Sequence, residues 1–431
     1  MRWSKAHPQI VGQKTMFFER QRAKALETFH EFPRPFWTLA VVTFIDRLGG
    51  YLLFPFFALY LTRRFGVGMT QVGLLFALFS ISSFAGTAIG GALTDRLGRK
   101  KILIFSLLST SLSSLIMGFV NSLQAFFVVA LMVGVFTDTG GPAHQAMVAD
   151  LLPERKRAQG YGIIRVAFNL SAAIGPAIGG FLATRSYLSL FIADAVISLI
   201  TAIIVLLTLP ETRPQSEPGA AQESLTGTFR GYAEVFRDTH FMMFLGACIL
   251  MGLVYMNMNT TLGVYLRDFH AVPESGYGLI LSLNAVMVVF LQFPITRRIE
   301  AYPPMLMMAL GSALYAIGFA MYGFVSVYSM FMLAMVIITI GEMLVAPVAQ
   351  ALTARLAPED MRGRYMAVFG FSFGIPYAIG PILAGRIMDG SEPEFLWYAA
   401  GVVGVMATAC FLWLHRQVRP SPAPSAPEVS L

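Results

Sequence analysis

Charged side chains are scarce in this sequence. Asp, Glu, Lys and Arg together make up 13% of its 431 residues, which is about half of the roughly 25% found in soluble globular proteins. This shortage excludes a water-soluble surface of ordinary size. It also excludes intrinsic disorder, which requires high charge and low hydrophobicity. Hydrophobic residues instead make up 56% of the chain, so the sequence predicts a protein that spans a lipid bilayer.

Cysteine is nearly absent as well, because Cys248 and Cys410 are the only two. Both lie in apolar stretches, so we expect neither a disulfide framework nor a cysteine metal site. The sequence also lacks a glycine-rich nucleotide loop and any nucleophile–base spacing. We therefore expect no enzyme activity, no cofactor and no bound metal, and we expect a gradient rather than ATP to supply energy. The first 35 residues are polar and basic, so no cleavable signal peptide is predicted.

Apolar runs of about 20 residues recur along the chain, and they match the length of membrane-spanning helices. The alternation of apolar and polar residues that marks barrel strands does not occur. We therefore predict an all-α membrane protein with twelve transmembrane helices. Their expected bounds are 36–61, 70–93, 102–120, 124–149, 160–183, 187–208, 240–265, 275–296, 303–324, 328–351, 363–387 and 394–415.

Lys and Arg are distributed unevenly between the two sets of loops. Of the 31 basic residues, 24 fall in the two tails and in the loops on their side, and five fall in the opposite loops. Basic residues accumulate on the cytoplasmic side of membrane proteins. This predicts that both termini are cytoplasmic. We expect such a multi-pass protein in the bacterial inner membrane. The net charge of +7 then needs no nucleic acid partner to explain it.

The longest polar stretch, residues 209–239, contains Pro210, Pro214 and Pro218. It predicts a cytoplasmic linker, because such residues interrupt helices and keep a chain extended. The linker divides the predicted helices into six and six. We accordingly expect an N-terminal tail over 1–35, a six-helix bundle over 36–208, a second bundle over 240–415 and a C-terminal tail over 416–431.

The second half of the chain repeats the first at a constant offset of 205 residues. Matching pairs include Gly73 and Gly278, Pro142 and Pro347, Pro176 and Pro381, and Gly180 and Gly385. Six helices separate equivalent positions, so the halves share one orientation and are related by an axis along the membrane normal. The repeat predicts two pseudo-symmetric six-helix bundles with a binding site between them near the midplane.

The loop after the second predicted helix has the sequence GALTDRLGRKK over residues 91–101. This resembles the signature loop of the major facilitator superfamily, whose members are membrane transporters, and implies the fold of that family. In the family the loop acts as a latch for the outward-open state. The alternative is a basic cytoplasmic loop without a latch. The residues implied for the latch are Gly91, Asp95, Arg96, Gly98, Arg99 and Lys100.

The fifth predicted helix carries a second pattern of small residues. It resembles the antiporter motif of the same superfamily, with Ser171 in place of one glycine. In the family this motif is associated with exporters that exchange their substrate for protons or other ions. Ordinary close packing is the alternative, because small residues let helices approach each other in lipid. The matching residues are Gly162, Gly175, Pro176, Gly179 and Gly180.

Acidic residues occur within four of the predicted helices, at Asp46, Asp138, Asp194 and Glu342. An ionised acid at the centre of a bilayer helix costs about 2.5–3.5 kcal/mol. Such a residue therefore usually faces a water-filled cavity, pairs with a cation or stays protonated. We predict that these acids bind protons or substrate, and a structural network of buried charges is the alternative. Asp194 also fits an interfacial position.

Four further residues place polar groups in the predicted spans and are candidates for the same site. They are Arg47, Asn169, Asn257 and Asn284. The alternative for Arg47 is a structural charge network with Asp46. For Asn257 and Asn284 it is a hydrogen bond that only stabilises helix contacts.

The resemblance covers residues 36–415 and points to the drug–proton antiporter branch of the superfamily. It implies a monomeric secondary active transporter that exports lipophilic small molecules in exchange for protons by alternating access, in contact with membrane lipids. The family's fourth-helix motif has an Arg where this chain has Ala130, so any proton coupling must use other residues. Two alternatives stay open. One is a proton-coupled importer or facilitator of a nutrient, or a lipid transporter; the other is a membrane sensor or assembly partner that does not transport.

Overall fold

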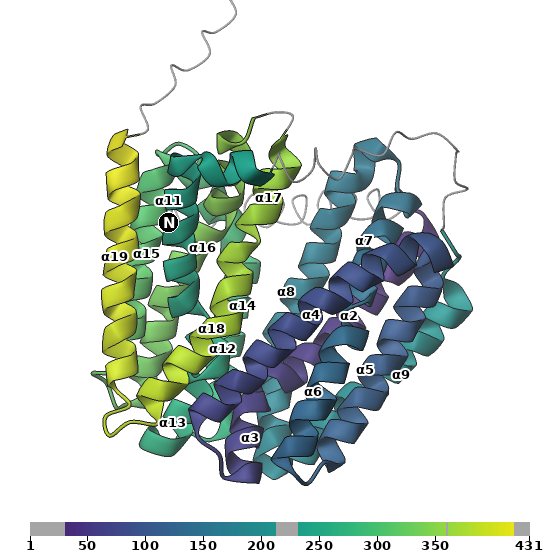
Figure 1. Cartoon of the computed structure of the whole chain (residues 1–431), viewed down its shortest axis with the longest axis horizontal. Helices are drawn as coiled ribbons and strands as arrows, with labels where there is room; N and C mark the ends of the chain where they lie inside the picture. Colours follow the sequence, from purple (N-terminus) through teal and green to yellow (C-terminus); the bar gives the residue numbers. More distant parts are fainter. Residues whose placement is uncertain (1–30, 213–231, 359–360, 418–431) are drawn as a thin grey trace, which may run out of the picture.

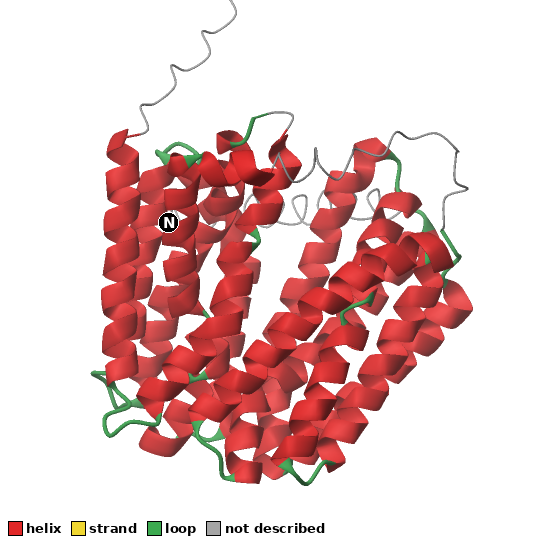
Figure 2. Cartoon of the chain, viewed as in Figure 1, coloured by secondary structure: helices red, strands yellow, loops and turns green. Residues whose placement is uncertain are grey.

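The computed structural model describes residues 31–212, 232–358 and 361–417. The regular structure in these ranges is helical (Figure 2). Twelve helical segments are long and apolar enough to cross a membrane, so the prediction of an all-α protein with twelve spans is confirmed. The predicted tails over 1–35 and 416–431 and the predicted linker over 209–239 lie largely outside the described residues.

The first half contains six spans. The first of them consists of α2 (Arg34–Leu53), the short 3-10 helix η1 (Phe54–Phe56) and α3 (Phe57–Phe65). The others are α4 (Met69–Leu97), α5 (Arg99–Phe119), α6 (Leu123–Thr137) with α7 (Gly140–Leu151), α8 (Glu154–Arg185) and α9 (Tyr187–Thr208).

The second half contains the other six spans. The first of these is α11 (Thr239–Tyr255), followed by α12 (Asn257–Thr260) and α13 (Leu262–His270). The others are α14 (Glu274–Ile299), α15 (Pro304–Met321), α16 (Tyr328–Leu356), α17 (Arg362–Phe369) with α18 (Phe371–Met388), and α19 (Phe395–Gln417).

Several spans are interrupted where a continuous helix was predicted. The first breaks at η1, where Pro55 has no N–H to donate. The fourth breaks at Asp138, whose φ of −84° and ψ of 0° leave the α-helical region. Gly140, Gly141 and Pro142 follow this break, and all three are poor helix formers. Asp138 therefore lies at the end of α6 rather than in mid-helix.

The two halves form two bundles, α2–α9 and α11–α19 (Figure 1). The bundles come together at the end of the molecule where α3 and α13 lie, and they diverge toward the end where α7 and α17 lie. We call these the α3–α13 end and the α7–α17 end. The signature loop joins α4 to α5 and lies at the α7–α17 end.

Four glycines let the halves meet closely at the α3–α13 end, and they form two pairs related by the sequence repeat. Gly73 of α4 lies against the backbone of Pro381 in α18, and its repeat partner Gly278 of α14 lies against Pro176 in α8. Likewise, Gly180 of α8 faces the first turn of α14, and Gly385 of α18 faces the first turn of α4. A Cβ atom at any of the four would collide with that backbone. The repeat is therefore realised as a pseudo-symmetric interface between the bundles.

Candidate functional site

A cavity of about 900 Å³ lies within the first half and is bordered on one side by α18 of the second half. Its lining is mainly apolar, with aromatic side chains from α4 and α18. Among the polar groups that line it are Asp46, Arg47, Asp138, His144 and Asp194. Three of the four predicted acids are thus brought to one cavity, together with the predicted Arg47.

Asp46 and Arg47 lie on α2 and form a loose ion pair, with 3.9 Å between the Arg47 Nε and an Asp46 carboxylate oxygen. The Arg47 guanidinium also lies 4.7 Å from the centre of the Phe168 ring. Both side chains line the cavity, even though adjacent residues of an α-helix project about 100° apart. Asp138 is exposed to the same cavity at the break between α6 and α7.

Asp194 occupies the most enclosed position of the three acids in this cavity, with 4% of its surface exposed. The Ser114 hydroxyl of α5 donates to its carboxylate at 2.5 Å. A Cβ atom at Gly49 of α2 would lie 2.6 Å from the same carboxylate. Asp194 is therefore buried between α2, α5 and α9 rather than placed at a membrane interface.

Glu342 lies in a separate pocket of about 230 Å³. The Tyr255 hydroxyl donates to one carboxylate oxygen at 2.9 Å, and the Asn284 amide donates to the other at 2.7 Å. Asn284 also donates to the Thr339 hydroxyl at 3.0 Å. The lining includes Asn169 and Pro176 of α8, so both halves contribute to this pocket. Of the predicted amides, Asn169 and Asn284 are therefore gathered around Glu342.

Asn257 is placed differently from the other predicted polar residues. It is buried in α12, where its amide donates to the carbonyls of Leu253 and Val254 and its oxygen accepts from Thr261. These bonds cap the interruption between α11 and α13. Asn257 is not among the residues that line either cavity.

Sequence reasoning missed His144, Tyr255 and Tyr377. His144 shares a 2.6 Å hydrogen bond with the Thr43 hydroxyl and lines the large cavity. A histidine inside a predicted span was a usable signal. Tyr377 lines both cavities, but nothing in the sequence distinguishes it or Tyr255 from the other tyrosines of the chain.

The signature loop is held by contacts within the first half. Arg99, which is 8% exposed, pairs with Asp95 at 3.3 Å and with Asp150 at 3.0 Å. Gly98 has a φ of +103°, which favours glycine, and Glu211 accepts from the Arg99 backbone N–H at 2.7 Å. Asp95 thus pairs within its own segment while the bundles diverge at this end.

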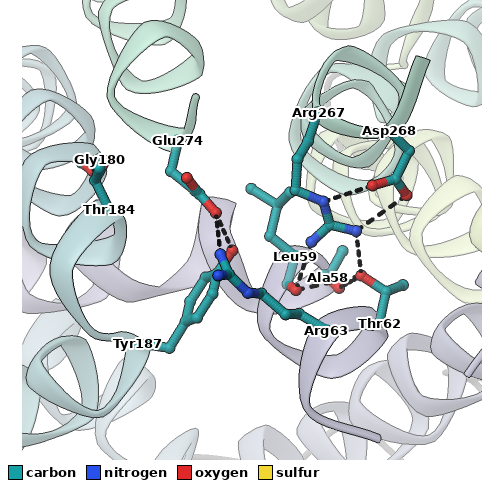
Figure 3. A network of polar contacts seen from close by, with 10 residues as sticks. All are labelled: Ala58, Leu59, Thr62, Arg63, Gly180, Thr184, Tyr187, Arg267, Asp268 and Glu274. Atoms are coloured by element: carbon teal, nitrogen blue, oxygen red, sulfur yellow. Dashed lines mark hydrogen bonds and ion pairs between the residues drawn. The ribbon is translucent and has the colours of Figure 1, made fainter. Parts of the chain in front are cut away.

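The α3–α13 end is closed by a polar network between the halves, drawn in Figure 3. Glu274 of α14 is 6% exposed; it accepts from Arg63 at 3.3 Å and from the Tyr187 hydroxyl at 2.6 Å. Arg267 of α13 donates to the Leu59 carbonyl and to the Thr62 hydroxyl, each at 3.0 Å. This cluster therefore holds α13 and α14 against α3 and α9.

A second contact closes the other side of the same end. The Asp389 carboxylate, just after α18, accepts from the backbone N–H groups of Met69 at 2.6 Å and Thr70 at 2.8 Å. These are the first residues of α4, so one half supplies the N-terminal cap of a helix in the other.

The antiporter motif lies at helix contacts. Gly175 and Gly179 of α8 pack on Tyr51 and Leu52 of α2. Gly180, as described above, packs on α14. A Cβ atom at Gly162 would meet no atom of the described residues within 4 Å. The motif therefore joins α8 to α2 within its own bundle and to the second half at the closed end.

Two bundles that are joined by polar contacts at one end and diverge at the other can open a central cavity to either side of a membrane in turn. The family model of the Major Facilitator Superfamily matches residues 39–273 and 250–430. The chain belongs to this superfamily of transporters. Membership of the superfamily explains the two six-helix bundles. The match also includes the signature loop over residues 91–101.

The chain is also similar to individual members of the superfamily. A Na(+), Li(+), K(+)/H(+) antiporter of Planococcus maritimus is 26% identical over 398 residues, covering 84% of this chain and 92% of the relative. The multidrug resistance protein MdtH of Shigella boydii is 22% identical over 378 residues, covering 86% and 92%. The crystal structure of the nucleoside transporter NupG matches with a TM-score of 0.76 and 14% identity, covering 89% of this chain and 99% of that one. This last likeness concerns the fold alone.

Proposed function

We propose that the protein is a secondary active transporter that exports lipophilic small molecules in exchange for protons by alternating access. It acts as a monomer in the bacterial inner membrane, with both termini in the cytoplasm. The single observation that carries the proposal is the cavity of about 900 Å³, which combines an apolar, aromatic lining with Asp46, Asp138 and Asp194. A volume of this size suits drug-sized ligands. The similarity to MdtH is additional support.

In the proposed cycle, protons and substrate compete for the carboxylates. A protonated acid is neutral and tolerates a closed, dry cavity, whereas an ionised acid favours water or a bound cation. Proton and substrate therefore stabilise different orientations of the two bundles, and this difference in affinity couples their movements. Asp46, Asp138 and Glu342 are the proposed coupling residues, with Arg47 and Asp194 beside the substrate.

The two ends of the molecule would alternate in closure. The α3–α13 end, the periplasmic end in this proposal, is held by Glu274 and Asp389, and the α7–α17 end faces the cytoplasm. When the bundles rock, Asp95 would exchange its contact with Arg99 for one with the second half. The latch residues Gly91 and Gly98 would allow the close approach that this contact requires.

Transport by purified protein in liposomes tests the proposal. Tetraphenylphosphonium flux should follow an imposed pH gradient while the membrane potential is clamped. The triple variant Asp46→Asn, Asp138→Asn, Glu342→Gln should lose at least about tenfold of that flux, because each substitution removes a proton-carrying group. Flux that ignores the gradient, or full activity of the triple variant, rejects the mechanism.

A second candidate function is the exchange of alkali cations for protons. The specific observation in its favour is the small pocket around Glu342, whose lining includes three asparagines and three tyrosines beside apolar residues. The printed name of the Planococcus relative describes this activity.

A further inference from the structure

The pocket around Glu342 differs from the large cavity in size, lining and position, which indicates a different ligand. From these differences we propose that it binds one alkali-metal cation, Na⁺ or K⁺, in competition with a proton. The large cavity is then the site for organic substrate. The inference rests on the alternating-access function proposed above and assigns the coupling cation to one pocket within it.

The charge around Glu342 is the first argument. Among the described residues, three tyrosines line the pocket with Glu342: Tyr51 of α2, Tyr255 of α11 and Tyr377 of α18. A fourth, Tyr315 of α15, stacks on the Tyr255 ring. Tyrosines are neutral at physiological pH. The described residues that line the pocket include no Lys, Arg or His. Asp46, by contrast, has Arg47 beside it, so Glu342 lacks the paired cation that Asp46 has.

The lining of the pocket is the second argument. Tyr255 and Asn284 each donate to one oxygen of the Glu342 carboxylate, and each oxygen keeps a further lone pair for a cation. Asn169 and Asn259, from opposite halves, also line the pocket, and each carries an amide oxygen that can bind a cation. Hard cations prefer such carboxylate, amide and hydroxyl oxygens. Tyr255 and Asn284 are therefore positioning residues that orient the carboxylate.

The size of the pocket is the third argument. A volume of about 230 Å³ holds a cation with a few waters, since each water occupies about 30 Å³ in the liquid. It lies below the roughly 300–1,000 Å³ of typical sites for organic ligands. An organic substrate therefore fits the large cavity and not this one.

The position of the pocket explains how a bound cation would act on the whole protein. Both halves contribute to the lining, so closure of the α7–α17 end would enclose Glu342 and exclude water. An enclosed carboxylate without a counter-charge is strongly unfavourable. The bundles should therefore close around Glu342 only when it carries a proton or a cation. Tyr377 lines both cavities, so a change in its position on closure would affect the cation pocket and the substrate site together.

Thermal unfolding of the purified full-length protein in detergent tests the inference. NaCl or KCl, compared with choline chloride at equal ionic strength, should raise the unfolding temperature to saturation, as expected for a ligand that binds the native state. The apparent Kd should rise as the pH falls, approaching tenfold per pH unit, because protons occupy the same carboxylate.

Variants assign the effect to the pocket. Glu342→Gln should weaken Na⁺ binding at least tenfold, whereas Glu300→Gln, on an exposed acid at the end of the same helix as Asn284, should leave it unchanged. Tyr255→Phe keeps the ring but removes a donor to the carboxylate. Protons should then displace Na⁺ at a higher pH, which a purely structural role of Tyr255 would not produce. This second variant keeps the test valid if Glu342→Gln does not fold.

Two outcomes overturn the inference. One is the absence of stabilisation by Na⁺ and K⁺ in the unchanged protein, and the other is unchanged Na⁺ binding by folded Glu342→Gln. Tetraphenylphosphonium transport by the same protein, reconstituted in liposomes, separates this failure from failure of the proposed function. If that transport remains proton-driven, only the cation site is wrong; if it too is absent, both proposals fail.

Discussion

Asp194 and Glu342 show, at the scale of single residues, two ways in which neutral donors hold an acid inside the bundle. Asp194 takes one strong hydrogen bond from Ser114 and is almost fully buried. Glu342 takes two bonds and remains partly accessible in its pocket. The first arrangement fixes the Asp194 carboxylate in the wall of the large cavity, and the second leaves the Glu342 carboxylate accessible to a further ligand.

Ser114→Ala should destabilise the protein by about 1–3 kcal/mol, because it leaves the buried Asp194 carboxyl without its hydrogen-bond partner. The measurement is the unfolding temperature in detergent. Ser113→Ala is the matched control, since Ser113 lines the same cavity from the same helix. Equal unfolding temperatures for the two variants would contradict a stabilising role for the Ser114–Asp194 bond.

The sequence identified the acids inside the spans but not their partners. Asp46, Asp138, Asp194 and Glu342 stand out because charge is rare in an apolar helix. The partners of Glu342 lie 58 and 87 residues away in the chain, and only the packing of α11, α14 and α16 brings them together. For Asn257 the sequence suggested a position in a cavity. In the structure its side chain instead bonds to nearby residues of its own span, where the helix is interrupted.

At the scale of elements, the N-terminus of α4 depends on a residue of the other half. The residue before α4 is Gly68, which has no side chain to cap the helix, and Asp389 supplies the missing cap from the second half. The cap therefore exists only while the α3–α13 end is closed. Separation of the bundles at this end would therefore leave the first N–H groups of α4 without their cap.

Asp389→Asn should weaken closure of the α3–α13 end. Loss of a charge near a helix N-terminus costs about 0.3–1 kcal/mol, which corresponds to a two- to fivefold shift toward the open population. Spin labels at Ser186→Cys and Ser326→Cys, exposed positions in loops of opposite halves at this end, would report the shift as a larger share of long distances. An unchanged distance distribution would show that this cap does not contribute to closure.

Gly278→Leu should separate the same end more strongly, because a side chain there would overlap the backbone of Pro176. With the same labels we expect long distances to predominate. Gly246→Leu is the control, since a Cβ atom at Gly246 meets no atom of the described residues within 4 Å. If both variants gave the distribution of the unchanged protein, close approach at Gly278 would not be required for closure.

The helices and their repeat were predictable because hydrophobic length and the 205-residue offset are properties of the sequence itself. The small residues of the antiporter motif also indicated close contacts, and the structure shows that Gly179 lies against the backbone of Leu52 and Gly180 against that of Glu274. The break at Asp138 was not anticipated, because Gly and Pro occur within transmembrane helices as well as at their ends. Pro347, the repeat partner of Pro142, lies inside the continuous helix α16.

The whole molecule combines a symmetric frame with unequal ends. The four interface glycines obey the repeat, whereas the polar contacts do not: Asp389 corresponds to Thr184, which donates to the Gly180 carbonyl within its own helix. The two sides of the α3–α13 end are therefore closed by different chemistry, an acid on a helix end at one and an Arg–Glu–Tyr cluster at the other. The large cavity is likewise unsymmetric, because its lining comes mainly from the first of the two halves.

A disulfide across the α3–α13 end tests whether transport requires this end to open. A Cβ atom at Gly68 would lie 2.8 Å from the Asp389 Cγ, which is compatible with the Cβ separation of about 3.5–4.5 Å in disulfides. In Gly68→Cys/Asp389→Cys, oxidation should lower flux at least tenfold, because the bundles can no longer rock, while cation binding at Glu342 persists. Reduction should restore the flux to the level before oxidation, and each single variant should be insensitive to oxidant, since Cys248 is buried and Cys410 partly buried. Full flux through the oxidised double variant would mean that the closed network is a fixed part of the fold, and that alternating access does not operate at this end.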